Sequence, residues 1–157
     1  MKTKYILIAV ALFCSTFCFA QDKLIDKYAD MDGVTSVYIS KAMFQMIGSV
    51  AGNMGDMQGL DLKDMSGKLE SLQVLKSEKQ SVREQMRKDF TGTVKAGYEE
   101  LMKIKSEGTT ANFYIQQSGD LIRDLLMLTD TDGDFIVIRL KGNFTMQDIQ
   151  NMAEKMQ

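Results

Sequence analysis

The alternation of apolar and polar residues in the first half of the chain predicts helices and strands in turn. Residues 22–32 place apolar side chains at helical spacing, and Gly33 ends this segment. Residues 34–39 are rich in β-branched and aromatic side chains, which is typical of a strand. A second helix is predicted to begin after Ser40, which can cap it, and a second strand covers residues 69–75.

The longest predicted helix begins at Ser81, because Ser81 and Glu84 have the spacing of a capping box. Apolar residues then recur every three or four positions, and Glu107 and Gly108 close the pattern. We therefore expect one amphipathic helix of about 24 residues, roughly 36 Å long. Its apolar stripe would consist of Val82, Met86, Phe90, Val94, Gly97, Tyr98, Leu101 and Ile104.

The last third of the chain predicts a three-stranded meander followed by a helix. Asp132 and Gly133 form a strong hairpin signal, and Thr145 to Asp148 opens the final helix. The predicted fold class is therefore α+β, with a single layer of about five mostly antiparallel strands covered by helices. The three strands of the meander are expected at residues 111–115, 121–128 and 135–140.

The first twenty residues have the pattern of a secretory signal peptide. Lys2 and Lys4 precede an apolar run that is too short to span a bilayer, and small residues precede a cut after Ala20. Cys14 and Cys18 each follow a phenylalanine, where lipoprotein signals usually have Gly, Ala or Ser, so the pattern disfavours a lipid anchor. We expect an exported protein, periplasmic or extracellular, in association with the cell envelope.

Cleavage after Ala20 would leave a single α+β domain at residues 21–157, with no cysteine and no transmembrane segment. The formal charge of the whole chain is −2, and loss of Lys2 and Lys4 makes it −4. A net acidic chain is poorly suited to coat nucleic acid, so we expect no nucleic-acid partner.

The absence of histidine excludes several kinds of site. The chain has no His, Pro or Trp, and its only two cysteines lie in the predicted signal peptide. Without His there is no Ser–His or Cys–His catalytic pair and no His-ligated zinc, haem or copper. We expect no cofactor.

Two segments have residue types that bind metals in other proteins. Residues 130–134 resemble part of a calcium loop, but Gly133 stands at the fourth position rather than the sixth, and no Glu occupies the twelfth. A hairpin turn is therefore the favoured interpretation. Met43 and Met46 have thioethers that could bind Cu(I), but they fall on the apolar face of a predicted helix, where packing or a soft binding surface is favoured.

The acidic residues give no catalytic constellation. Glu99 and Glu100 are adjacent on the predicted long helix and project in different directions. Asp120, Asp124 and Asp148 have no partner that the sequence identifies. The chain also lacks a phosphate-binding Gly-x-x-x-x-Gly-Lys loop. We predict no catalytic residue and a protein that is not an enzyme.

Residues 53–67 are rich in Gly, Met and Asp, which predicts a long flexible connection with a short helical turn near Leu60 to Met65. Adaptable methionine-rich surfaces can repack around varied partners. The candidate contact residues of this segment are Met54, Met57, Leu60 and Met65.

Three segments, at residues 34–44, 69–75 and 135–144, resemble a family of small exported Bacteroidetes proteins catalogued as domain of unknown function 4252. The Ala20–Gln21 signal ending is also similar to that group. The resemblance implies no activity and no site residue. Members tend to be encoded near extracytoplasmic-function sigma factors, so the resemblance implies a role in envelope stress or signalling.

The favoured function is a non-enzymatic interaction or signalling module of the cell envelope, with a partner of unknown identity. A homodimer is among the assemblies expected. The alternative is a carrier or sensor of a small apolar or lipid-like ligand held between the sheet and the long helix, because abundant Met, Leu, Ile and Phe could line such a cavity.

Overall fold

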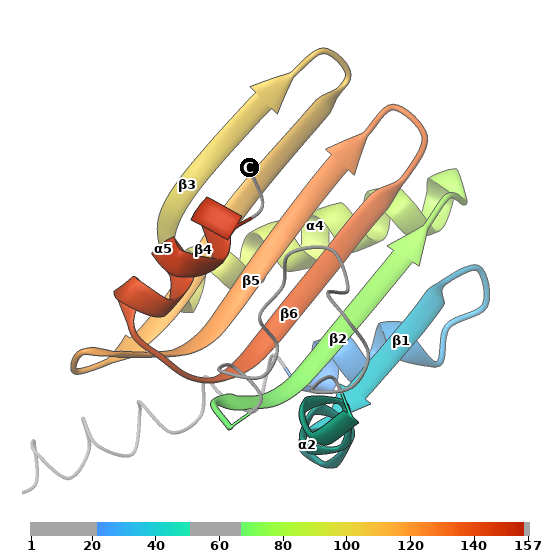
Figure 1. Ribbon diagram of the computed structural model, residues 1–157. Coiled ribbons are helices and arrows are strands. Elements are labelled where there is room, and N and C mark those ends of the chain that lie inside the picture. The colour runs from blue at the N-terminus through green and yellow to red at the C-terminus, as the bar shows by residue number, and fades with distance from the viewer. Residues whose placement is uncertain (1–21, 51–66, 156–157) are drawn as a thin grey trace, which may run out of the picture.

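The computed structural model describes residues 22–50 and 67–155, which form one six-stranded sheet and four helices (Figure 1). The first helix, at residues 22–29, is called the N-terminal helix. The fold class is α+β, as predicted. The elements that follow are β1 (Thr35–Ser40), α2 (Lys41–Val50), β2 (Leu69–Ser77), α4 (Gln80–Gly97), β3 (Glu99–Ser106), β4 (Thr109–Ser118), β5 (Leu121–Thr131), β6 (Phe135–Phe144) and α5 (Met146–Lys155).

The strands are ordered β1-β2-β6-β5-β4-β3, and each neighbouring pair is antiparallel. The predicted meander is present as β4, β5 and β6, with β3 added at its outer side. β1 and β3 are therefore the two edge strands of an open sheet. The long helix α4 lies behind the sheet in Figure 1, whereas α2 and α5 lie at the front.

The main core lies between the sheet and the pair formed by the N-terminal helix and α4. The predicted stripe of α4 faces the sheet: Val82, Met86, Phe90 and Val94 are all buried. The ring of Phe90 lies 5.7 Å from that of Tyr28 on the N-terminal helix, measured between centroids. Complete burial of such side chains contributes about 1.5–3 kcal/mol each. The sheet side of this core consists of Leu75, Leu126, Leu128, Phe135 and Val137.

The prediction of one helix from Ser81 to Ile104 is wrong beyond Gly97. α4 ends at Gly97, Tyr98 is extended, and Glu99–Ser106 forms strand β3. Within β3, Met102 and Ile104 alternate with lysines, which is the two-residue period of a strand. The same apolar residues also fit helical spacing, and pairing with β4 decides between the two. The sheet consequently has six strands rather than five, and Glu99 and Glu100 lie on a strand.

The predicted capping box of α4 is also wrong. The helix begins at Gln80, so Ser81 lies inside its first turn, and Lys79 is the N-cap without a side-chain hydrogen bond. A reciprocal cap is found at α5 instead. The backbone N–H of Thr145 donates to Asp148 Oδ2 at 2.8 Å, and the N–H of Asp148 donates to Thr145 Oγ1 at 3.2 Å.

Several predictions lie outside the described residues. The predicted signal peptide at residues 1–20 is among them, as is the connection at residues 53–67 apart from Gly67. Within the described ranges, no helix combines the length and the hydropathy that a membrane crossing needs.

Candidate functional site

One face of the sheet exposes a row of apolar side chains that crosses every strand. Residues directly opposite each other in an antiparallel sheet share a face, so the strand register identifies the row. Its four inner members are half-buried, whereas Val37 and Met102 at its ends are each 46% exposed. We call this surface the open face. Across the sheet, the row consists of Val37, Val74, Ile138, Met127, Phe113 and Met102.

A second row on the open face is partly apolar. Ile104, which is 48% exposed, pairs with Ala111, and Ile136 pairs with Thr129 further across the sheet. On the opposite face, residues of β2, β5 and β6 pack against α4 and are buried. The open face is thus the side of the sheet where large apolar groups meet solvent, and such contiguous patches mark interaction sites.

Helices α2 and α5 cover one end of the open face. Phe44 of α2 is buried there with Ile115 and Phe144, and Ile149 of α5 packs against the same group. Methionines at the outer surface of these helices remain exposed: Met43 and Met46 on α2 are 47% and 61% exposed, and Met146 on α5 is 38% exposed. Met43 and Met46, which the sequence assigns to the apolar face of this helix, are thus largely exposed rather than packed in a core.

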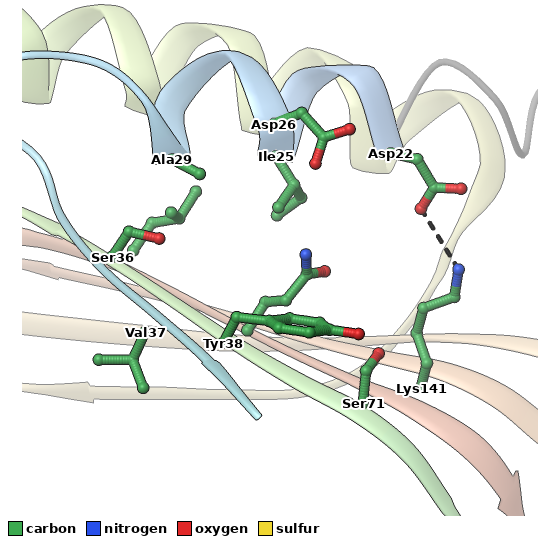
Figure 2. A pocket seen from close by; sticks show the side chains of 11 residues that line it. Asp22, Ile25, Asp26, Ala29, Ser36, Val37, Tyr38, Ser71 and Lys141 are labelled. Carbon is green, nitrogen blue, oxygen red and sulfur yellow. Dashed lines mark hydrogen bonds and ion pairs between the residues drawn. The ribbon is translucent and has the colours of Figure 1, made fainter. Parts of the chain in front are cut away.

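A groove opens on the other face, between the N-terminal helix and strands β1 and β2. Its volume is about 430 Å³, within the range of ligand sites in proteins. Figure 2 shows Ile25 pointing down from the helix and Asp26 beside it at the upper edge of the groove, with Ser36, Tyr38 and Ser71 on the sheet below. The groove therefore has an apolar back, a carboxylate on one wall, and hydroxyl groups with an aromatic ring on the other.

A buried ion pair adjoins the inner end of this groove. Arg139 of β6 is 3% exposed and donates to Asp124 Oδ2 through Nε at 2.9 Å and Nη2 at 2.6 Å. Its Nη1 reaches Asp22 Oδ1 at 2.7 Å, and Lys141 Nζ lies 3.3 Å from the same oxygen. The N-terminal helix is thereby tied to the centre of the sheet.

The pKa values of these groups follow from burial and charge. Burial alone would lower the pKa of Arg139, but the hydrogen bonds and the charge of Asp124 raise it above its ordinary value. Burial would raise the pKa of Asp22, yet Arg139 and Lys141 bring it below the ordinary value. Burial raises the pKa of Tyr98, and the negative charge of Asp124 adds to this effect. Arg139 and Asp22 therefore stay charged at neutral pH, and Tyr98 stays neutral.

The structure supplies partners for two carboxylates that the sequence left without one. Asp124 pairs with Arg139, and Asp148 Oδ1 lies 2.6 Å from Lys68 Nζ. For Asp120, the described residues supply no hydrogen bond or ion pair.

The segment at residues 130–134 is a hairpin turn, the interpretation that the sequence favoured. The backbone N–H groups of Gly133 and Asp134 donate to Thr131 Oγ1 at 3.2 and 2.9 Å. Asp130 receives two hydrogen bonds from Arg87 of α4, at 2.5 and 2.6 Å. Among the residues that the structure describes, no group of three or more His, Cys, Asp and Glu side chains is close enough to hold a metal ion.

The candidate contact residues Met54, Met57, Leu60 and Met65 lie outside the described residues. Sequence reasoning missed both the open face and the groove. A signal for the groove was present, because Asp22 and Asp26 are four residues apart on one helix and Ser36 and Tyr38 alternate on one strand. The open face could not be found in the sequence while β3 was assigned to a helix.

Comparison with known proteins identifies the family. No curated protein and no solved structure matches the chain. The family model described as Domain of unknown function (DUF4252) matches residues 28–152, a range that includes every strand and the open face. The chain therefore belongs to the DUF4252 family.

Proposed function

We propose that this protein is a non-enzymatic, exported module of the cell envelope that binds a partner protein through the open face. The observation that supports this most directly is the apolar row from Val37 to Met102, one residue from each strand. Leaving such a surface in water is unfavourable by about 25 cal/mol per Å² of apolar area, so a partner that covers it gains that free energy.

The partner is expected to present an apolar surface of its own. The inner part of the open face offers Val74, Ile138 and Met127 without a charged group in their row. Methionines 43, 46 and 146 extend the apolar character onto α2 and α5. Methionine side chains adapt to irregular surfaces, which suits a protein partner whose shape varies.

The alternative function is a carrier of a small apolar or lipid-like ligand between the sheet and the long helix. In the described part of the chain, a cavity there, next to Leu24, Phe90 and Leu126, has a volume of about 10 Å³. This space is at the lower limit for one water molecule. We therefore favour the interaction module, and native mass spectrometry would reveal a ligand that the carrier function requires.

The export part of the proposal is supported by the charged, apolar and small-residue pattern that ends at Ala20. Its test is the mass of the protein recovered from the envelope fraction of its own host. Loss of residues 1–20 supports export with cleavage, whereas an intact N-terminus in the cytoplasm contradicts it.

The binding part of the proposal is tested by making the open face polar at its centre. The double variant Val74→Thr and Ile138→Thr keeps the branched shape that strands favour and removes apolar surface. We expect at least a tenfold loss of cross-linked partner from the host envelope. Thr129→Val, on the same face, is the matched control and should retain the partner or bind more of it.

Circular dichroism and urea unfolding would establish that both variants are folded. Equal partner recovery by the folded double variant and the wild type would contradict binding through the open face. A stoichiometric small-molecule adduct on the wild type, without a protein partner, would favour the carrier function instead.

A further inference from the structure

The sheet has two free edges, and both present exposed side chains. β1 pairs only with β2, and β3 pairs only with β4, within the described residues. All eight residues of β3 are exposed, and so are Val37 and Tyr38 of β1. Edge strands offer rows of unpaired backbone N–H and C=O groups, which can pair with another strand.

The directions of the two edges are compatible with each other. Because six strands alternate in direction across the sheet, β1 and β3 run in opposite directions. If a second copy lies beside the first in the same orientation, its β3 meets β1 as an antiparallel neighbour. The helices of both copies then lie on the same face of the joined sheet.

The side chains of the two edges also match on each face. On the open face, Met102 and Ile104 of β3 would extend the row that ends at Val37. On the opposite face, where α4 and the N-terminal helix lie, β3 presents Lys103 and Lys105. On the same face, β1 presents Ser36 and Tyr38, which line the groove. Apolar groups would thus meet apolar groups, and lysines would enter the groove.

The groove has groups suited to a lysine ammonium. The Asp26 carboxylate lies at the edge of the groove in Figure 2, and no hydrogen bond or ion pair engages that carboxylate in the described part of the chain. Ser71 is 9% exposed, and its hydroxyl likewise has no partner among the described residues. Opposed cross-strand residues have Cβ atoms about 4.5–5.5 Å apart, so a long lysine side chain opposite Ser36 or Tyr38 could extend into the groove.

We propose that β3 of one copy adds to β1 of a second copy, with Lys103 or Lys105 entering the groove beside Asp26. This contact joins two different surfaces, so it is heterologous and repeats until a ring closes or a filament grows. It leaves the open faces uncovered and aligned, so partner binding there and edge pairing are independent.

Lysines and β-bulges at an edge can also prevent pairing. Both are present in β3, where the register shifts between Glu100 and Met102. A protective role predicts a monomer at every concentration, so measurement of the assembly state distinguishes the two roles.

The test reverses the charge on each side of the proposed contact, at Asp26 beside the groove and at Lys103 and Lys105 on β3. The full chain is expressed, and the purified protein is examined by sedimentation velocity over a wide concentration range at low salt. We expect the wild-type average mass to rise with concentration and to fall again in high salt, which screens the lysine–carboxylate attraction. Asp26→Lys alone and Lys103→Glu with Lys105→Glu should each weaken association at least tenfold, because like charges then face each other.

Mixing the two charge-reversed proteins should restore association, because each then meets an oppositely charged edge. The control is the double variant Lys88→Glu and Lys95→Glu, at exposed positions of α4. It changes the net charge by the same amount as Lys103→Glu with Lys105→Glu and should associate like the wild type. If circular dichroism shows that Asp26→Lys does not fold, Asp26→Asn replaces it, and we expect an intermediate loss of self-association.

Three outcomes would overturn the proposal. The first is a wild-type monomer at all concentrations. The second is normal self-association of either charge-reversed protein alone, which would indicate pairing of two identical edges. The third is equal weakening by the α4 control, which would indicate a general charge effect. Partner capture by the Val74→Thr and Ile138→Thr double variant tests the open face, whereas sedimentation of the charge-reversed proteins tests the contact between β3 and β1. Either proposal can therefore fail without the other.

Discussion

Arg139 and Asp124 place two charges in the centre of the sheet, where each is at most 4% exposed at its side chain. Removing one member of a buried pair leaves the other without compensation, which typically costs 3–5 kcal/mol. We therefore expect Asp124→Ala to lower the free energy of unfolding by about 3–5 kcal/mol, measured by urea denaturation. Lys27→Met removes the exposed pair with Asp89 and should cost at most about 1 kcal/mol. Equal losses in the two variants would contradict this difference.

Asp89 gives the fold a dependence on pH. The hydroxyl of Tyr28 donates to Asp89 Oδ2 at 2.7 Å, and this bond, together with Lys27, lowers the pKa of Asp89 below its ordinary value. The unfolded chain therefore binds a proton at this site more readily than the folded chain does. The stabilisation is present above the ordinary value of 3.8 and is lost as the pH falls through the lower folded pKa.

We expect the free energy of unfolding to fall as the pH is lowered from about 5 to 3, and Asp89→Asn to reduce the slope of that fall. Urea denaturation at several pH values measures both. Asp22, Asp134 and Asp148 also have lowered pKa values, so the variant should reduce the slope without abolishing it. An unchanged slope in the variant would show that Asp89 does not contribute.

At the scale of elements, the sequence predicted an element correctly where its apolar spacing fitted only one kind of secondary structure. The stripe of α4 from Val82 to Val94 is correct because a helix needs one face against the sheet. The continuation to Ile104 is wrong because Met102 and Ile104 fit both periods, and the pairing of β3 with β4 is a long-range property that local spacing does not contain. The ion pair of Asp124 and Arg139 was missed for the same reason.

Two glycines in regular elements should respond to substitution in opposite directions. Gly92 lies inside α4 with open space where a Cβ would be, so Gly92→Ala should raise the free energy of unfolding by about 0.5–1 kcal/mol through helix propensity. At Gly142 a Cβ would lie 2.3 Å from the backbone oxygen of Lys68 and 2.5 Å from the ring of Phe144. Gly142→Ala should therefore destabilise the protein strongly, and thermal unfolding measures both. Stabilisation by Gly142→Ala would contradict the close approach.

At the scale of the whole molecule, the fold class and the order of most elements followed from the sequence, but the surfaces did not. The open face exists because, among the described residues, helices cover only one side of the sheet centre, and α2 and α5 reach only one end of the other side. The groove exists because the N-terminal helix leaves Ser36 and Tyr38 uncovered. Both depend on how elements pack, which the apolar pattern of any single element does not specify.

The strand order has a consequence for how the chain reaches this structure. β4, β5 and β6 each pair with a strand adjacent in sequence, whereas β2 pairs with β6 across a loop that contains α4 and three strands. Closing that loop has a larger entropic cost, and such non-local contacts slow folding. β1 and β2 leave the ribosome long before β6, so the complete sheet forms only when the chain is nearly finished. A nascent chain of this topology therefore remains incompletely folded through most of its synthesis, a state compatible with transport across a membrane before folding.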